Sequence, residues 1–221
     1  MIEFHSLIPE LVYDMPIEKA KISSFEWYNK IIQDYKNNNP KPNIHTSRCP
    51  GILNICNIGW VQRSYQDFVI TTNGDSKSFL WESEIDQKSL KHGELLRDYV
   101  SYHPAERLFK FNQVKKDTLQ TILKIQSPWL VKIPKGYSLL FMPIPYNDNN
   151  NFTAACGILK DSNFLNVQLF WHCLNDTIII KKGTPLQQYV LIKDESIESV
   201  VKEASLEQFN NVESVKWYLS I

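Results

Sequence analysis

Six short apolar runs, separated by turn-forming residues, dominate the second half of this 221-residue chain and constrain its fold most strongly. The runs cover residues 129–133, 137–142, 154–159, 167–173, 177–180 and 187–192. Turn sequences such as Pro134-Lys135-Gly136 and Lys181-Lys182-Gly183 stand between them. Short strands at a spacing of roughly 8–12 residues are typical of all-β sandwiches and barrels. We therefore expect a mainly β protein with a sandwich-like or barrel-like core.

The first half of the chain also favours strands. Residues 68–72 are β-branched and aromatic, Asn73-Gly74 follows directly, and residues 78–82 form the expected return strand of a hairpin. Residues 51–64 are predicted to form one extended element with a break at Gly59, and residues 118–125 are predicted to be a strand rather than a helix. Residues 108–111 alternate in polarity, and residues 89–99 are compatible with either a short helix or a loop.

Helical periodicity is confined to the two ends of the core. Residues 1–20 contain Pro9 and Pro16 and are expected to be extended. A helix at about 24–36 is predicted from apolar residues at helical spacing: Trp27, Tyr28, Ile31, Ile32 and Tyr35. From Ser196 onward, the pattern again predicts a helix, with one apolar face: Ile197, Val200, Val201 and Leu206.

No break in composition requires a second domain, so residues 1–221 are expected to form a single domain. We divide it into an N-terminal extension (1–45), a β-rich core (46–193) and a C-terminal helical segment (194–221). Whether residues 1–45 pack on their own core or on a neighbouring subunit is left open by the sequence.

Composition excludes several classes of partner. Lys and Arg number 24, as do Asp and Glu, so there is no strong electrostatic signal for nucleic acid binding. No apolar run approaches the ~20 residues of a membrane-spanning helix, and the first residues lack the pattern of a signal peptide. Cysteines 49, 56, 156 and 173 do not form a CxxC pair, and we expect reduced, buried thiols in a cytoplasmic protein.

Candidate metal ligands are few. The chain has only seven glycines and lacks the GxGxxG, Walker A, GxSxG and HExxH motifs. His103 and Glu106 are three residues apart, and together with His172 they would form a two-His-one-carboxylate metal site if the fold brought them together. The alternatives are that His103 caps a turn before Pro104 and that His172 is a hydrogen-bonded histidine of the sheet. Whether the chain is an enzyme, and with which cofactor, remains open.

Several segments resemble a family of proteins of uncharacterised activity that tailed bacteriophages and some bacteria encode. The segments are residues 25–30, 49–52 with 59–61, 103–106, 127–138 and 181–186, of which 127–138 is the most specific. The resemblance implies a phage-type protein that acts in the cytoplasm of the host.

The C-terminal half is also similar in layout to the β-clip fold of dUTPases and dCTP deaminases, through residues 134–137, 157–161 and 179–190. This resemblance implies a β-clip-like core, self-association, and a nucleotide-like ligand held by four side chains: Lys132, Asp161, Gln168 and Gln188. Lys160 stands at the position of the family's catalytic aspartate and Asp161 comes one residue later, so dUTPase catalysis is not expected. The alternatives are a structural or assembly component of the virion and a metal-dependent enzyme using His103, Glu106 and His172.

Overall fold

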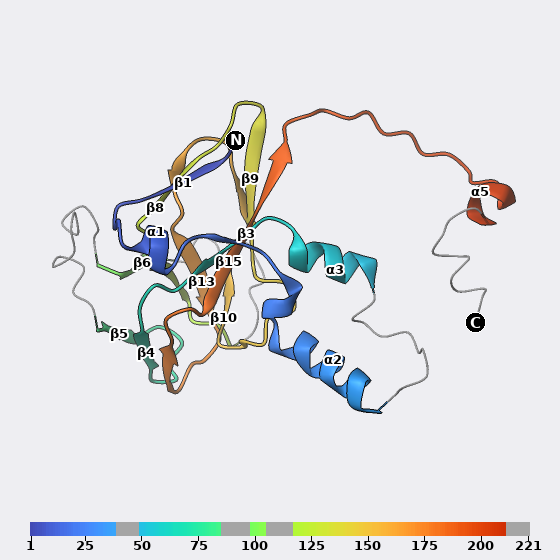
Figure 1. Cartoon of the computed structure of the whole chain (residues 1–221). Coiled ribbons are helices and arrows are strands. Elements are labelled where there is room, and N and C mark those ends of the chain that lie inside the picture. The colour runs from blue at the N-terminus through green and yellow to red at the C-terminus, as the bar shows by residue number, and fades with distance from the viewer. Residues whose placement is uncertain (39–48, 85–97, 105–116, 211–221) are drawn as a thin grey trace.

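Antiparallel strands dominate the computed structural model, which describes residues 1–38, 49–84, 98–104 and 117–210 (Figure 1). Within these residues the strands form four sheets. The first sheet has the order β1 (Glu3–Ser6), β8 (Trp129–Lys132), β12 (Asn163–Phe164). The second has the order β10 (Phe152–Ala154), β13 (Val167–Trp171), β7 (Thr121–Ile125), β6 (Val100–Pro104). The prediction of a mainly β fold is confirmed.

The two remaining sheets contain the longest strand and the predicted hairpin. The third has the order β11 (Gly157–Leu159), β9 (Tyr137–Met142), β15 (Pro185–Lys193), β3 (Trp60–Arg63), β2 (Glu18–Lys19). The fourth has the order β14 (Thr177–Ile180), β4 (Phe68–Thr72), β5 (Phe79–Ser83). Thr72 pairs with Phe79, so residues 73–78 form the connecting loop of the hairpin.

Helices lie beside the β strands rather than among them (Figure 1). They are α1 (Leu11–Asp14), the 3₁₀ turn η1 (Ile22–Ser24), α2 (Glu26–Asn38), α3 (Pro50–Asn57) and α5 (Leu206–Asn210). Helix α2 confirms the predicted N-terminal helix. Residues 1–20 are largely extended, as expected, with the short α1 between Pro9 and Pro16. Strand β1 pairs with β8 and β2 pairs with β3, so this part of the N-terminal extension packs on its own chain.

The core lies between the sheets. Its largest fully buried side chains are Trp171, Tyr99, Tyr189 and Phe68. Strands β4 and β13 alternate between buried and half-buried residues, because successive side chains of a strand point to opposite faces. The remaining C-terminal strands agree with their predicted runs, except that residues 154–159 are divided between β10 and β11.

Residues 51–57 are helical, which corrects the strand predicted there. Pro50 occupies the start of α3, where a missing N–H costs no hydrogen bond. In the helix Cys56 is buried and Asn54 is exposed, whereas strand alternation would have placed both on one face. The Asn57 side chain then fixes the end of the helix, since its amide donates to Leu53 O at 2.7 Å and its oxygen accepts from Ile22 N at 2.9 Å.

The predicted C-terminal helix begins later than expected. Residues 194–205 contain no helix or strand, and α5 begins only at Leu206. Ile197, Val200 and Val201 are 83%, 74% and 99% exposed, so no described part of the chain covers the predicted apolar face. Because most helical stability in proteins comes from such packing, periodicity was a weak predictor here.

The cysteines agree only in part with the expectation of buried thiols. All four cysteines are free, as expected, but Cys49 and Cys156 are exposed and only Cys56 is buried.

In the described part of the chain no helix is long and apolar enough to span a membrane. The predictions for residues 89–97 and 108–111 lie outside the described residues.

Candidate ligand-binding cleft

Two adjoining cavities beside the loop that follows β9 form the candidate site. The first has a volume of about 210 Å³ and the second about 340 Å³, and Ile144, Asn147 and Asn149 line both. The first is completed by Pro143, Asn150, Phe152, Thr153, Ala154 and Leu186. The second is completed by Ser24, Phe25, Glu26, Val61, Arg63, Asp148, Thr184 and Pro185. We refer to the two together as the Asn cleft.

An irregularity in β15 shapes the floor of the Asn cleft. The pairing of β15 with β3 shifts register between Pro185 and Gln187, which leaves Leu186 without a partner on β3. Pro185 lacks an N–H and is tolerated because it is the first residue of the strand. Leu186 is almost fully buried and lines the first cavity. Bulges of this kind are common next to binding sites, where they redirect a side chain.

Asparagine side chains build the wall of the cleft. Asn147 Oδ1 accepts from Asn149 N at 3.2 Å, and Asn149 Oδ1 accepts from Asn151 N at 2.8 Å. These two Asx turns use the oxygen of each carboxamide and leave its NH₂ group to donate elsewhere. The Asn150 carboxamide makes no hydrogen bond among the described residues, so it offers both a donor and an acceptor at the first cavity.

Charges around the second cavity balance. Arg63 Nη1 donates to Gly183 O at 2.9 Å, which fixes the guanidinium while its other N–H groups remain as donors. Glu26 forms an ion pair with Lys30 at 2.6 Å, and the hydrogen bond from Lys30 lowers the pKa of Glu26. The pKa of Lys30 is raised by Glu26 and, to a smaller extent, by Asp148. The lining therefore carries Arg63, Glu26 and Asp148, and Lys30 beside it pairs with Glu26.

Four aromatic rings pack together near the start of α2, and one of them, Phe25, lines the second cavity. Trp27, in the first turn of α2, contacts Phe25, Tyr28 and Tyr146 with ring centroids 6.0, 5.8 and 6.2 Å apart. Phe25 itself lines the cavity, and Tyr146 directly precedes Asn147. The Asn-rich run 147–151 was predicted only as a turn, because such a run is the ordinary signature of one.

A hydrogen-bonded histidine stands behind the first cavity. His172 Nε2 lies 2.7 Å from Thr153 Oγ1, and His172 Nδ1 lies 3.0 Å from Thr118 Oγ1. The backbone N–H of His172 donates to Asn151 O at 2.7 Å. One of the predicted metal ligands therefore adjoins the Asn cleft through Thr153, and both of its ring nitrogens have threonine hydroxyls as neighbours.

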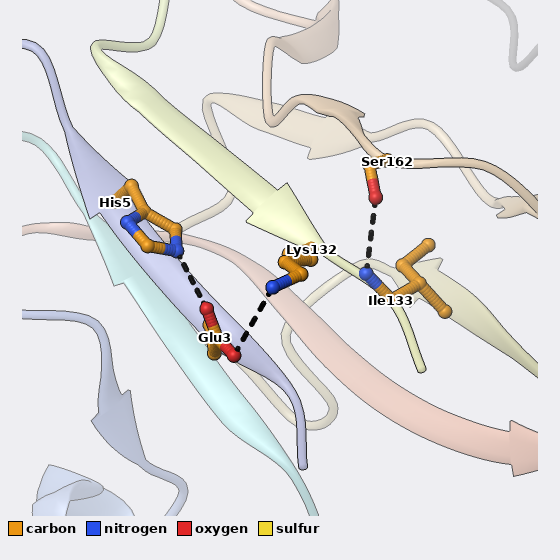
Figure 2. A network of polar contacts seen from close by, with 5 residues as sticks. All are labelled: Glu3, His5, Lys132, Ile133 and Ser162. Atoms are coloured by element: carbon orange, nitrogen blue, oxygen red, sulfur yellow. Dashed lines mark hydrogen bonds and ion pairs between the residues drawn. The ribbon is translucent and has the colours of Figure 1, made fainter. Parts of the chain in front are cut away.

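Lys132 and Asp161, two of the four predicted ligand-binding residues, lie outside the Asn cleft, and both are exposed. Lys132 on β8 is directly opposite Glu3 on β1, and its Nζ is 3.5 Å from Glu3 Oε1 (Figure 2). His5 Nε2 lies 3.0 Å from Glu3 Oε2, and these two neighbours, His5 first, lower the pKa of Glu3. Asp161 is in the turn after β11, and the next residue, Ser162, accepts a hydrogen bond from Ile133 N at 3.3 Å.

The two predicted glutamines lie elsewhere. Gln168 on β13 is half-buried and is opposite Lys124 of β7. Gln188 on β15 is fully buried, and its Nε2 donates to Ile55 O and Ile58 O, both at 2.8 Å. Gln188 thus secures the end of α3. The structure brings Lys132 close to the turn containing Asp161 but gathers neither of them with the two glutamines.

The predicted metal ligands are on different strands. His103 is exposed on β6, His172 follows β13, and β7 lies between these two strands. Adjacent strands are ~4.8 Å apart, which separates the two backbones by roughly 10 Å. Glu106 lies outside the described residues, and within them no three His, Cys, Asp or Glu side chains gather as metal ligands. The metal site stays a prediction.

Comparisons with known proteins give this chain neither a family nor an activity. No protein family matches the sequence, and no curated protein does. Among solved structures, a mutant dUTPase from phage phi11 of S. aureus is similar over 77% of this chain and 94% of its own, with 11% identity and a TM-score of 0.36. A likeness at this TM-score supports no argument about activity.

Proposed function

We propose that this chain binds a small, uncharged polar molecule of nucleoside size in the Asn cleft. The observation that carries the proposal is that Asn147 and Asn149 line both cavities beside the buried Ile144. Asn150 and Leu186 complete the first cavity, and Arg63 lines the second. Ligand sites are typically clefts of ~300–1,000 Å³ with an apolar lining and a few polar groups that fix orientation. The Asn cleft has this composition.

The charge balance of the cleft argues for an uncharged ligand. Arg63 and Lys30 are offset by Glu26 and Asp148, so a triphosphate would find no excess of positive charge. Carboxamides and a fixed guanidinium instead suit carbonyl, hydroxyl and ring-nitrogen groups. The sequence resemblance led us to expect a nucleotide-like ligand. Because of this charge balance, we propose the uncharged nucleoside rather than the charged nucleotide.

Binding without dUTPase hydrolysis is part of the proposal. The first cavity is lined by amides, a hydroxyl and apolar groups, and no carboxylate is among its described lining residues. Asp161 lines neither cavity. A role in phage-infected bacteria, in the host cytoplasm, is proposed as well and is supported by the sequence resemblance described above.

Thermal unfolding in the presence of uridine, adenosine, their triphosphates and ribose tests the proposal. A ligand at 100 times its Kd stabilises the folded state by ~2.7 kcal/mol, which raises the Tm of a chain of this size by roughly 5–10 °C. We expect a rise with the nucleosides and a smaller one with the triphosphates. Asn150→Ala, which disturbs no hydrogen bond among the described residues, should weaken the effect, whereas Lys132→Ala should not. No shift with any compound would overturn the proposal.

Self-association is a second part of the proposal, and a specific observation favours it. The segment 194–205 leads away from the β strands and carries exposed Ile197, Val200 and Val201 (Figure 1). Isolated apolar side chains on a surface are ordinary, but three on one unpaired segment indicate a surface that another molecule covers. We propose that a second copy of the chain covers them.

Sedimentation velocity of the full chain and of a chain ending at Lys193 measures this association. We expect the full chain to form dimers or trimers and the shortened chain to dissociate. Large assemblies of the full chain would instead favour a role as a structural component of the virion. A monomeric full chain would contradict both the proposed self-association and a structural role in the virion.

A further inference from the structure

Tyr146 has an unfavourable backbone conformation that the fold does not compensate. Its φ is 53°, in the left-handed region that side chains other than glycine and asparagine rarely adopt. The residue is 55% exposed, so burial contributes little to offset the backbone strain. Strained residues of this kind are concentrated at ligand sites, where the surrounding structure holds them in place.

The ring of Tyr146 is also held in a fixed orientation. It packs edge-on against Trp27, with ring centroids 6.2 Å apart and an interplanar angle of 63°. Trp27 is in turn held between Phe25 and Tyr28. A ring that is fixed on one side and exposed on the other presents a flat apolar surface to a molecule in solution.

This surface is adjacent in the chain to the Asn cleft. Tyr146 lines neither cavity itself but directly precedes Asn147, which lines both, and Trp27 follows the cavity residues Phe25 and Glu26. An aromatic surface next to hydrogen-bonding carboxamides is the combination that recognises a nucleobase, because every base has both a stacking face and a polar edge.

We propose that Tyr146 is the stacking platform for the planar ring of the ligand, so the ligand class is the nucleobases and their nucleosides. This inference rests on the proposed binding function of the Asn cleft. The carboxamides of Asn147 and Asn150 then read the polar edge of the ring, and the left-handed backbone at Tyr146 is the conformation that carries the phenol to this position. The phenol hydroxyl has no part in stacking.

Isothermal titration of uridine, adenosine and ribose into the wild-type chain and four variants tests this inference. Tyr146→Phe keeps the ring, and we expect it to change the affinity for the nucleosides less than about twofold. Tyr146→Asn tolerates the left-handed backbone but removes the ring, and we expect a loss of about tenfold, as base–aromatic stacking contributes elsewhere. Tyr146→Gly also removes the ring but, unlike Tyr146→Asn, adds no carboxamide, and we expect the same loss of affinity. Tyr102→Asn, at the exposed β6 edge of the sheet whose other edge carries Thr153, is the matched control and should bind like the wild type.

Thermal unfolding of the same variants separates stacking from a structural role. Tyr146→Asn and Tyr146→Gly relieve the backbone strain, so we expect their Tm to rise while their affinity falls. A fall in both Tm and affinity would overturn the inference, since Tyr146 would then be a structural residue. Ribose binding as tightly as uridine would overturn it and leave the proposed function standing. No binding by any of the three compounds to the wild-type chain would overturn both.

Discussion

At the scale of single residues, Gln188 shows how a polar side chain in the core can support the fold rather than a ligand. Its amide satisfies the carbonyls of Ile55 and Ile58, while its own oxygen has no partner among the described residues. Truncating one partner of a buried hydrogen bond costs more than the bond itself contributes, because the remaining group stays unsatisfied. Gln188 was predicted to bind a ligand, and sequence cannot distinguish these two roles.

Gln188→Leu should therefore lower the free energy of unfolding by about 1–2 kcal/mol. Urea denaturation of the variant and the wild type measures the difference. Gln168→Leu, a half-buried glutamine on the neighbouring sheet, is the control and should change stability by no more than ~0.5 kcal/mol. Equal effects of the two substitutions would show that the contact with α3 contributes nothing.

Gly59 is the residue where backbone geometry permits only glycine. Its φ is 77°, and a Cβ placed there would lie 1.9 Å from the carbonyl oxygen of Tyr189. The neighbour is backbone of the longest strand, so it cannot move aside as the end of a flexible side chain could. Strand pairing between β3 and β15 thus depends on the absence of a side chain at this position.

Gly59→Ala should destabilise the chain by about 3 kcal/mol or more, from the strained φ and the overlap together. Gly136→Ala is the matched control, since its φ is also positive at 79° but its Cβ would meet nothing within 4 Å. That control should lose only the ~1–2 kcal/mol of the left-handed conformation. Differential scanning calorimetry of both variants compares them, and similar losses would disprove the close contact.

At the scale of elements, the β4–β5 hairpin depends on a carboxylate in its loop. Asp75 Oδ1 accepts from Lys77 N and Ser78 N, both at 2.7 Å, and Asp75 Oδ2 accepts from Ser78 Oγ at 2.6 Å. The hydroxyl of Ser78 and these two backbone N–H groups hold the pKa of Asp75 well below its ordinary value. Asn-Gly correctly indicated the hairpin, but Asp75 organises its six-residue loop.

Because the pKa of Asp75 is lower in the folded chain, its contribution to stability is complete above the ordinary aspartate pKa of ~3.9 and declines as the pH falls below it. Asp75→Asn should remove this part of the pH dependence and lower the Tm at pH 7. Thermal unfolding of both proteins between pH 7 and pH 2 measures it. We expect the difference in Tm to narrow below about pH 4; a constant difference would contradict the assigned role.

Local pattern predicted strands and helix α2 well, because apolar periodicity reports directly which face is buried. It failed at residues 51–58, where a short, mostly apolar run fits either element. Pro50 together with the contacts of Asn57 and Gln188 decides for a helix. It failed again at residues 196–205, where no described part of the chain covers the periodic apolar residues. Contacts distant in sequence settle such segments, and a single sequence does not contain them.

At the scale of the whole molecule, the candidate site is assembled from segments far apart in the chain. Phe25 and Glu26 at the start of α2, Arg63 on β3, the loop 143–150 and Pro185 on β15 meet at one place. The sequence predicted several of the elements but not their meeting, because strand order was unknown. Of the four residues selected by resemblance, Lys132 lies instead opposite Glu3 of β1 (Figure 2). Asp161 lies in the turn between β11 and β12.

Nuclear magnetic resonance titration of the ¹⁵N-labelled chain with uridine tests the central claim most directly. We expect the largest shifts at the side-chain NH₂ groups of Asn147, Asn149 and Asn150 and at the guanidinium of Arg63. Lys132 on β8 and Ser162 just before β12 belong to another sheet, serve as the internal reference and should not shift. Shifts centred on that sheet, or no shifts with uridine or adenosine, would contradict a ligand site in the Asn cleft.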